Sequence, residues 1–182
     1  MSYTLYILLG ALVMGFILTY NRLLMLQQRV KNAWSQIDVQ LKRRYDLIPN
    51  LVEVAKGYLA HERQTLEEVI KARTQAMQAT AVKDKAEAEN FLTASLRSLF
   101  AVVENYPDLK ANQNMLKLHE ELTTTENKIS FARQYYSDEV MFYNTAIKSI
   151  PSNLVAALTN FKKEDFFEIE EPTHREAPKV KF

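Results

Sequence analysis

The chain has 182 residues, a net charge of +1, no cysteine and only three glycines. The balanced charge removes any overall attraction to nucleic acid, and the lack of cysteine excludes disulfides, thiol nucleophiles and thiolate metal sites. So little glycine also argues against glycine-rich phosphate loops and frequent tight turns, and helix-forming residues dominate instead.

The N-terminal segment is the first predicted element. No charged side chain occurs between Met1 and Asn21, and the run from Tyr3 to Tyr20 is almost wholly apolar. A helix of about 20 such residues crosses the ~30 Å hydrocarbon core of a bilayer. A cleaved signal peptide is the alternative, but it would have basic residues before the run and a small-residue cleavage site after it. Because both are missing, we interpret residues 1–27 as a retained transmembrane anchor.

The basic residues that flank the anchor, Arg22, Arg29 and Lys31, all follow it. Basic residues concentrate on the cytoplasmic side of a membrane span, so we expect the N-terminus outside and the body in the cytoplasm. These side chains can also contact lipid headgroups, which makes the bilayer an expected partner. Ala11 and Gly15 form a small-xxx-small pair that would let two anchors pack together.

The first helix of the body is predicted from its periodicity. Apolar residues recur every three or four positions from Val30 to Leu59, as in an amphipathic helix. The pattern runs through Pro49, so we expect a kink at residues 47–49 and then more helix, not a long loop. Nothing between the anchor and Val30 is a strong breaker, which allows one helix to continue from the membrane into the body.

Two more helices are predicted in the middle of the chain. Residues 61–80 form the second helical stretch, either as a separate helix or as a continuation of the first. Residues 81–85 have the composition of a polar connection. Residues 86–105 form the third helix, with apolar residues at heptad spacing.

The fourth helix has the clearest pattern, with apolar residues at steps of three and four over residues 115–147. Pro151 ends it, and Ser152 is expected to cap a short last helix through Leu158. Residues 162–182 are charged and contain two prolines, which predicts an extended tail.

The predicted fold is therefore all-α. Apolar stripes of this kind are buried most economically in an antiparallel up-and-down bundle. We expect a single transmembrane helix, a bundle of about four long helices with a kinked first helix over residues 28–161, and the tail.

Two blocks are more specific than a generic bundle. Residues 30–59 read VKNAWSQIDVQLKRRYDLIPNLVEVAKGYL, and residues 106–151 read YPDLKANQNMLKLHEELTTTENKISFARQYYSDEVMFYNTAIKSIP. Both closely resemble the LemA family of bacterial proteins, and the resemblance extends over nearly the whole chain, including the closing PKVKF. It implies a helical bundle anchored in the bacterial plasma membrane, with an extracellular N-terminus and a cytosolic body. It implies no known reaction.

The residues give no support to an enzyme. The one Glu-x-x-His spacing, from Glu171 to His174, contains a proline, whereas di-metal bundles need such pairs on facing helices. His61 and His119 are each followed by glutamate but lack the second histidine of a zinc-protease helix. We therefore expect no catalytic residues, no metal and no cofactor.

Polar side chains along the two signature helices form the main candidate site, and we expect Glu126 and Arg133, one heptad apart, to face the polar region of the first helix. One interpretation is a buried ion network that fixes helix register, and the other is a polar pocket for a ligand or partner. Acids alternate with the basic residues here, which argues against nucleic-acid binding. The candidate residues are Asp38, Arg43, Arg44, Asp46, Asn50, Glu53, Glu126 and Arg133.

Two groups of aromatic residues carry separate expectations. The pairs at residues 135–136 and 142–143 are expected in the core, with tyrosine hydroxyls reaching partners at its rim. Phe166 and Phe167 lie in an acidic part of the tail and need burial. They dock either on their own bundle or on a neighbouring subunit, and we treat them as a candidate inter-subunit contact.

Together these features predict a non-enzymatic scaffold or adaptor that self-associates and assembles proteins at the membrane. Its expected partners are the lipid bilayer, copies of itself, and unidentified membrane or cytoplasmic proteins. A membrane-shaping, coat-like protein is the alternative, and a sensory bundle becomes the alternative if the orientation is reversed.

Overall fold

The structure is a computed structural model that describes residues 2–167, and every regular element in this part of the chain is a helix. The all-α prediction is confirmed. The elements are α1 (Ser2–Lys56), α2 (Arg63–Gln78), α3 (Val82–Val103), α4 (Pro107–Lys110), α5 (Gln113–Ala146) and α6 (Ser152–Leu158).

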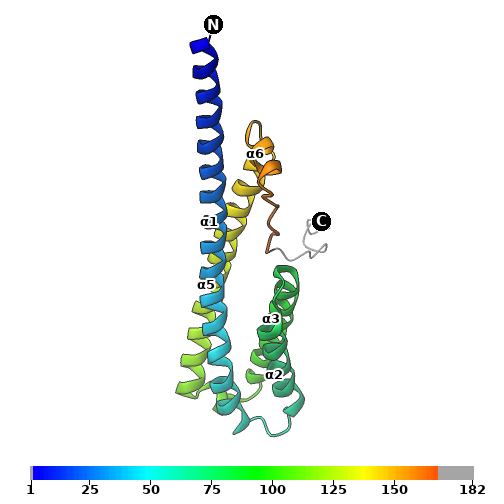
Figure 1. Cartoon of the computed structure of the whole chain (residues 1–182). Coiled ribbons are helices and arrows are strands. Elements are labelled where there is room, and N and C mark those ends of the chain that lie inside the picture. The colour runs from blue at the N-terminus through cyan, green and yellow to red at the C-terminus, as the bar shows by residue number, and fades with distance from the viewer. Residues whose placement is uncertain (1, 168–182) are drawn as a thin grey trace, which may run out of the picture.

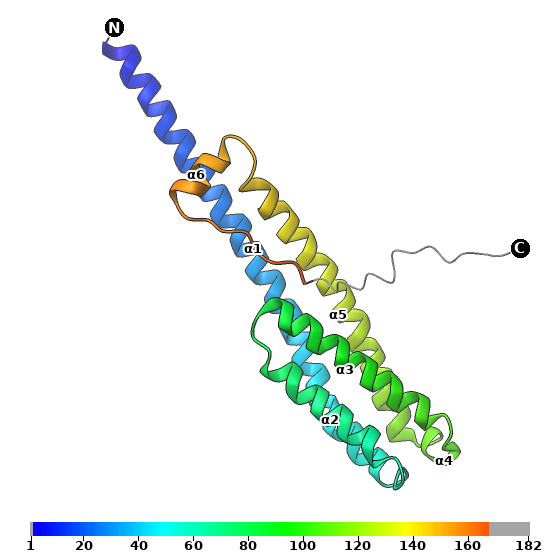
Figure 2. The same ribbon diagram turned by 90° about the vertical axis from the view of Figure 1, so that its right-hand side faces the viewer.

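The long helices run alternately in opposite directions, as in an up-and-down bundle (Figure 1). α1 and α5 form an antiparallel pair with the most extensive contact in the molecule. The α2–α3 hairpin covers one side of this pair over the half that lies far from the N-terminus (Figure 2). α6 and the segment after it lie over the other half, close to where the N-terminal part of α1 leaves the body.

α1 is one continuous helix, so the anchor passes into the body with no break between residues 27 and 28. At 1.5 Å per residue it is about 80 Å long. Its N-terminal part extends clear of the other helices, and large apolar side chains there, such as Leu8 and Leu12, are about 70% exposed (Figure 1). This part is long and apolar enough to cross a membrane.

α1 also continues through Pro49, and α2 compensates for the hydrogen bond that the proline cannot make. Pro49 lacks the N–H that would normally bond the carbonyl oxygen four residues earlier, on Tyr45. That oxygen instead accepts a hydrogen bond of 2.8 Å from Nε of Arg73 in α2. The proline therefore creates a fixed attachment point for the second helix.

Two local predictions are wrong. The helix α3 starts at Val82, inside the predicted connection, and Lys85 is buried there beside Tyr45 and 3.8 Å from the carboxylate of Asp38. Ser152 does not cap α6, because its hydroxyl donates to the carbonyl oxygen of Ala146 at 2.7 Å. It ties α6 back to the end of α5.

A strap, defined as residues 161–167, runs along α5 after α6. The hydroxyl of Tyr143 donates to the carbonyl of Lys162, and that of Tyr136 donates to the carbonyl of Asp165, each at 2.8 Å. Asn144 makes two further hydrogen bonds to the backbone of Glu164. The tyrosine hydroxyls thus find partners at the rim of the core, as predicted for these two residues.

The other two aromatic residues of the predicted core are exposed. Tyr135 is 43% and Phe142 55% exposed, whereas Tyr136 and Tyr143 are buried. Neighbouring residues in a helix differ by about 100° in direction, so the members of each pair face different sides of α5. The prediction of a buried aromatic cluster is therefore wrong for Tyr135 and Phe142.

Phe167 ends the strap inside the core of its own chain. Its ring lies 5.4 Å from that of Trp34, and the guanidinium carbon of Arg133 lies 4.7 Å from its centre. Only 3% of Phe167 is exposed, against 37% of Phe166. Phe167 is therefore occupied within the chain and not free for the inter-subunit contact that we considered. The rest of the predicted tail, residues 168–182, lies outside the described residues.

The strap generates a prediction about stability. We expect Phe167→Ala to lower the free energy of unfolding by about 3 kcal/mol, because it empties a core position beside Trp34. Phe166→Ala, one residue away, is the matched control and should cost about 0.5 kcal/mol or less. Urea unfolding of the full-length protein in mild detergent, followed by circular dichroism, measures both. Equal losses in the two variants would mean that the strap does not hold this position in solution.

Candidate functional site

Arg44 lies at the centre of a buried polar cluster that joins three helices. From α1, its guanidinium donates to the carboxylate of Glu89 in α3 at 3.2 Å and to the hydroxyl of Thr93 at 2.8 Å. It also pairs with Glu126 in α5 at 3.0 Å. The Arg44 side chain is 3% exposed and that of Glu89 is fully buried, whereas that of Glu126 is 42% exposed.

Glu89 is the buried anion of this cluster. It accepts a hydrogen bond from the hydroxyl of Tyr45 as well as from Arg44. Burial raises the pKa of Glu89, while the Tyr45 hydrogen bond and the charge of Arg44 act in the opposite direction. Burial, together with the hydrogen bond to Glu89, raises the pKa of Tyr45. The tyrosine therefore stays protonated and serves as a hydrogen-bond donor.

Arg133 occupies the same side of α5 as Glu126, but it is held differently. Its Nε and Nη2 atoms are buried and have no hydrogen-bond acceptor among residues 2–167. Burial lowers its pKa. Its described neighbour is the ring of Phe167, which receives the cation on its face.

The structure divides the predicted polar residues into two groups. Arg44, Glu126 and Arg133 face the interior, and Asp38 reaches it from the rim through its 3.8 Å pair with Lys85. The remaining four lie on the exposed side of α1, where Glu53 pairs only with its own helix neighbour Lys56. These four are Arg43, Asp46, Asn50 and Glu53.

Glu89 is the member of the cluster that sequence reasoning missed. A signal was present, because Glu89 lies three residues before Leu92 and so continues the apolar stripe of α3. An acid on the buried face of a helix requires a buried cation. The sequence contains no such sign for Thr93, because its hydroxyl matters only as an acceptor for Arg44, and that contact depends on how α1 and α3 pack.

A cavity of about 200 Å³ opens beside Arg44 between α3 and α5. On its walls the ring of His119 packs against that of Phe100 at a tilt of 37°, with ring centres 4.2 Å apart, and Arg97 and Asn127 add polar groups. Pockets for drug-sized ligands are larger, about 300–1,000 Å³. Two of the Arg44 nitrogens are already bonded to protein groups, so the cluster is built to hold α1, α3 and α5 together.

The outer face is a second candidate site, on the side of the α1–α5 pair that faces away from the α2–α3 hairpin. No described element covers it (Figure 1). Three large side chains there are exposed: Val39 (60%), Phe131 (74%) and Tyr135 (43%). They border a groove of about 440 Å³ between α1 and α5, which is also lined by Gln36, Gln40, Lys128 and Ala132.

Two buried acceptors lie along the seam of this face. Oε1 of Gln40 and Oε2 of Glu139 are inaccessible to water and have no hydrogen-bond donor among residues 2–167. Glu139 continues the spacing of Ala132 and Tyr135 along α5, which places it on the same side of the helix. A buried polar atom without a partner costs about 1–3 kcal/mol, so these two atoms mark positions where a donor would stabilise the protein.

The three membrane-flanking basic residues are all exposed on α1. Arg22 and Arg29 line a second groove with Met141 and Phe142 of α5, near the end of the body that faces the anchor. Lys31 lies outside that groove. All three side chains are accessible to lipid headgroups or to other proteins.

The fold and these sites define a class of protein: a membrane-associated, all-α bundle whose first helix also contains the apolar anchor. The sequence pattern of the LemA family matches residues 33–182. The chain belongs to the LemA family.

Curated relatives share the pattern at low identity. Magnetosome protein MamQ 2 of Paramagnetospirillum magneticum is 23% identical over 87% of this chain and 68% of its own length. Magnetosome protein MamQ of Magnetospirillum gryphiswaldense is 22% identical with the same coverage. Protein LemA of Metamycoplasma hominis is 26% identical over 75% of this chain and 63% of its own length. None of these names denotes an enzyme.

The buried cluster generates the second prediction. Arg44→Ala leaves the Glu89 carboxylate buried without its cation, which should cost about 3–5 kcal/mol of unfolding free energy. Arg43→Ala removes the same charge from the exposed neighbouring position and should cost about 0.5 kcal/mol or less. Urea unfolding of both full-length variants in detergent measures the difference. Similar small losses in both would contradict a buried pair.

Proposed function

We propose that this protein is a non-enzymatic scaffold that assembles with copies of itself at the membrane and presents its helical body to other proteins. The observation that carries the proposal is the outer face, with its exposed apolar side chains and its unpaired acceptors. An exposed apolar patch of this kind is typical of a protein interaction site. The relatives named as magnetosome proteins are consistent with a membrane-associated role.

The anchor determines how two copies can meet. Because α1 is continuous, copies inserted the same way into one membrane have their bodies at the same height. The simplest pairing is then a two-fold axis along the membrane normal. Val39 and Phe131 border the same groove and so lie at the same height. Under that symmetry Phe131 of each copy meets the Val39 region of the other.

Polar groups on the outer face are complementary under the same symmetry. In the antiparallel pair, Trp34 of α1 lies beside Tyr136 of α5, which fixes the relative height of the two helices. Counted from this contact, Arg29 and Glu139 lie within about 3 Å of the same height, and so do Lys128 and Gln40. The exposed cations of one copy therefore lie at the height of the unpaired acceptors of the other.

Co-anchoring makes such weak contacts effective. Restriction to one membrane raises the effective concentration of the bodies, so a modest interface is sufficient. The Ala11–Gly15 pair offers a further contact between anchors, because small residues let helices approach closely. We infer that the intact, membrane-inserted protein is the assembling form.

The orientation belongs to the same proposal. Arg22, Arg29 and Lys31 follow the anchor closely, which favours a cytoplasmic body. A C-terminal reporter enzyme that is active only outside the cytoplasm should be silent, and the same reporter at the N-terminus should be active. The reverse result would overturn the orientation and favour a sensory role outside the cell.

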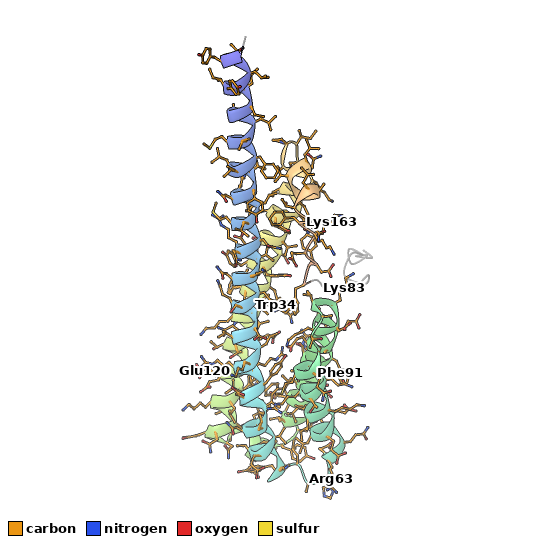
Figure 3. All side chains as sticks on the ribbon, in the orientation of Figure 1. Trp34, Arg63, Lys83, Phe91, Glu120 and Lys163 are labelled. Carbon is orange, nitrogen blue, oxygen red and sulfur yellow. The ribbon has the colours of Figure 1, made fainter. Side chains whose placement is uncertain are left out.

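Self-association through the outer face has a direct test. Phe131→Asp places a charge at the centre of the face and should convert the oligomer in mild detergent to monomer, as measured by light scattering. Phe91→Asp is the matched control, since Phe91 is an exposed aromatic residue on α3, on the hairpin side of the body (Figure 3). A wild-type protein that is monomeric both in detergent and in cross-linked membranes would remove the proposal. An open-ended series of large assemblies would favour the coat-like alternative.

A further inference from the structure

The short helix α6 exposes an unusual amount of apolar surface. Leu154 is 64% and Leu158 is 78% exposed, and Ile150, two residues before the helix, is 85% exposed. On its opposite side, Val155 and Ala156 are buried against Leu23 of α1 in a small separate core. α6 therefore attaches to α1 with its small residues and turns its large aliphatic residues outward.

The position of α6 along α1 is the second observation. Its contact residue Leu23 follows Tyr20, the last residue of the apolar run, by three positions, or about 4.5 Å of helix. The ring of Tyr20 itself lies 5.8 Å from that of Phe161, immediately after α6. Figure 1 shows α6 at the end of the body where the free part of α1 begins. α6 thus lies at the height where the membrane span ends.

The charges around α6 are the third observation. Lys148 precedes it, and Lys162 and Lys163 follow it, all exposed. Lys163 lies beside α6 (Figure 3) and lowers the pKa of Lys148, so two like charges are held close together. The acids Glu164 and Asp165 come later, on the strap as it runs away from the span.

We propose that α6 is a membrane-surface element, with Ile150, Leu154 and Leu158 inserted among the lipid headgroups and acyl-chain ends and the lysines bound to anionic headgroups. Lipid replaces water around apolar side chains at this depth, so no protein partner is needed to bury them. Flanking lysines add electrostatic attraction to anionic lipid. The surface is continuous with the apolar span of α1, so one bilayer contacts both. α6 then fixes the tilt of α1 by adding a second point of contact.

This inference requires only that α1 crosses a membrane, and it stands whether or not the protein is a scaffold. Its test uses the absence of native cysteine, which allows single-site labelling of the full chain. Nitroxide labels at Leu154→Cys and Leu158→Cys are compared with one at Leu116→Cys, an exposed leucine near the far end of the body. The full-length proteins are reconstituted in vesicles of phosphatidylethanolamine and phosphatidylglycerol.

Power saturation then measures how readily oxygen and a water-soluble nickel chelate reach each label. The labels at 154 and 158 should favour oxygen, which concentrates in lipid, and the label at 116 should favour the chelate, so the depth parameter should change sign between them. Chelate access at 154 and 158 equal to that at 116 would overturn the proposal. Low access by both probes would also overturn it, since a protein surface would then cover α6.

Discussion

The continuity of α1 is the constraint on which the rest of the structure depends. One helix contains the whole apolar segment and then continues through the body, so the direction of the apolar segment and the direction of the bundle are the same. α5 is antiparallel to it, and α6 meets it where the span ends. A flexible joint at residue 27 would have let the body move relative to the apolar segment. Because the helix is continuous there, each residue of the body has a fixed distance from the apolar segment along the helix axis.

The continuous helix includes a proline, and specific side chains of other helices compensate for the hydrogen bond that is lost there. Pro49 leaves the Tyr45 carbonyl without its normal backbone donor, and Arg73 of α2 supplies one. One residue before Tyr45, Arg44 brings a cation into the core, and Glu89, Thr93 and Glu126 surround it. Both arrangements join α1 to other helices with directional bonds, which specify register more sharply than apolar contact does.

The two sides of the α1–α5 pair have different roles. One side is covered, first by the α2–α3 hairpin and then by the strap and α6 (Figure 2). The other side is open and carries Phe131 and Val39 around a groove. An isolated helical pair that left such a groove exposed to water would lose the stabilisation that burial provides. In the self-associating scaffold that we propose, this groove is the site of contact between copies.

The sequence by itself determined the helical class, the long apolar N-terminal helix, the passage of helix through Pro49 and the family, because each follows from local periodicity or from long patterned blocks. It also predicted that Glu126 and Arg133 face the polar region of the first helix, but it did not separate Arg44, which is buried, from Arg43, which is exposed. Only the tertiary structure decided that Glu89 is the buried partner of Arg44, that Tyr135 and Phe142 are exposed, and that Phe167 is buried beside Trp34. The physical reason is that periodicity specifies a face of one helix. Which faces meet, at which height, and which sides stay open depend on how separate helices pack in space.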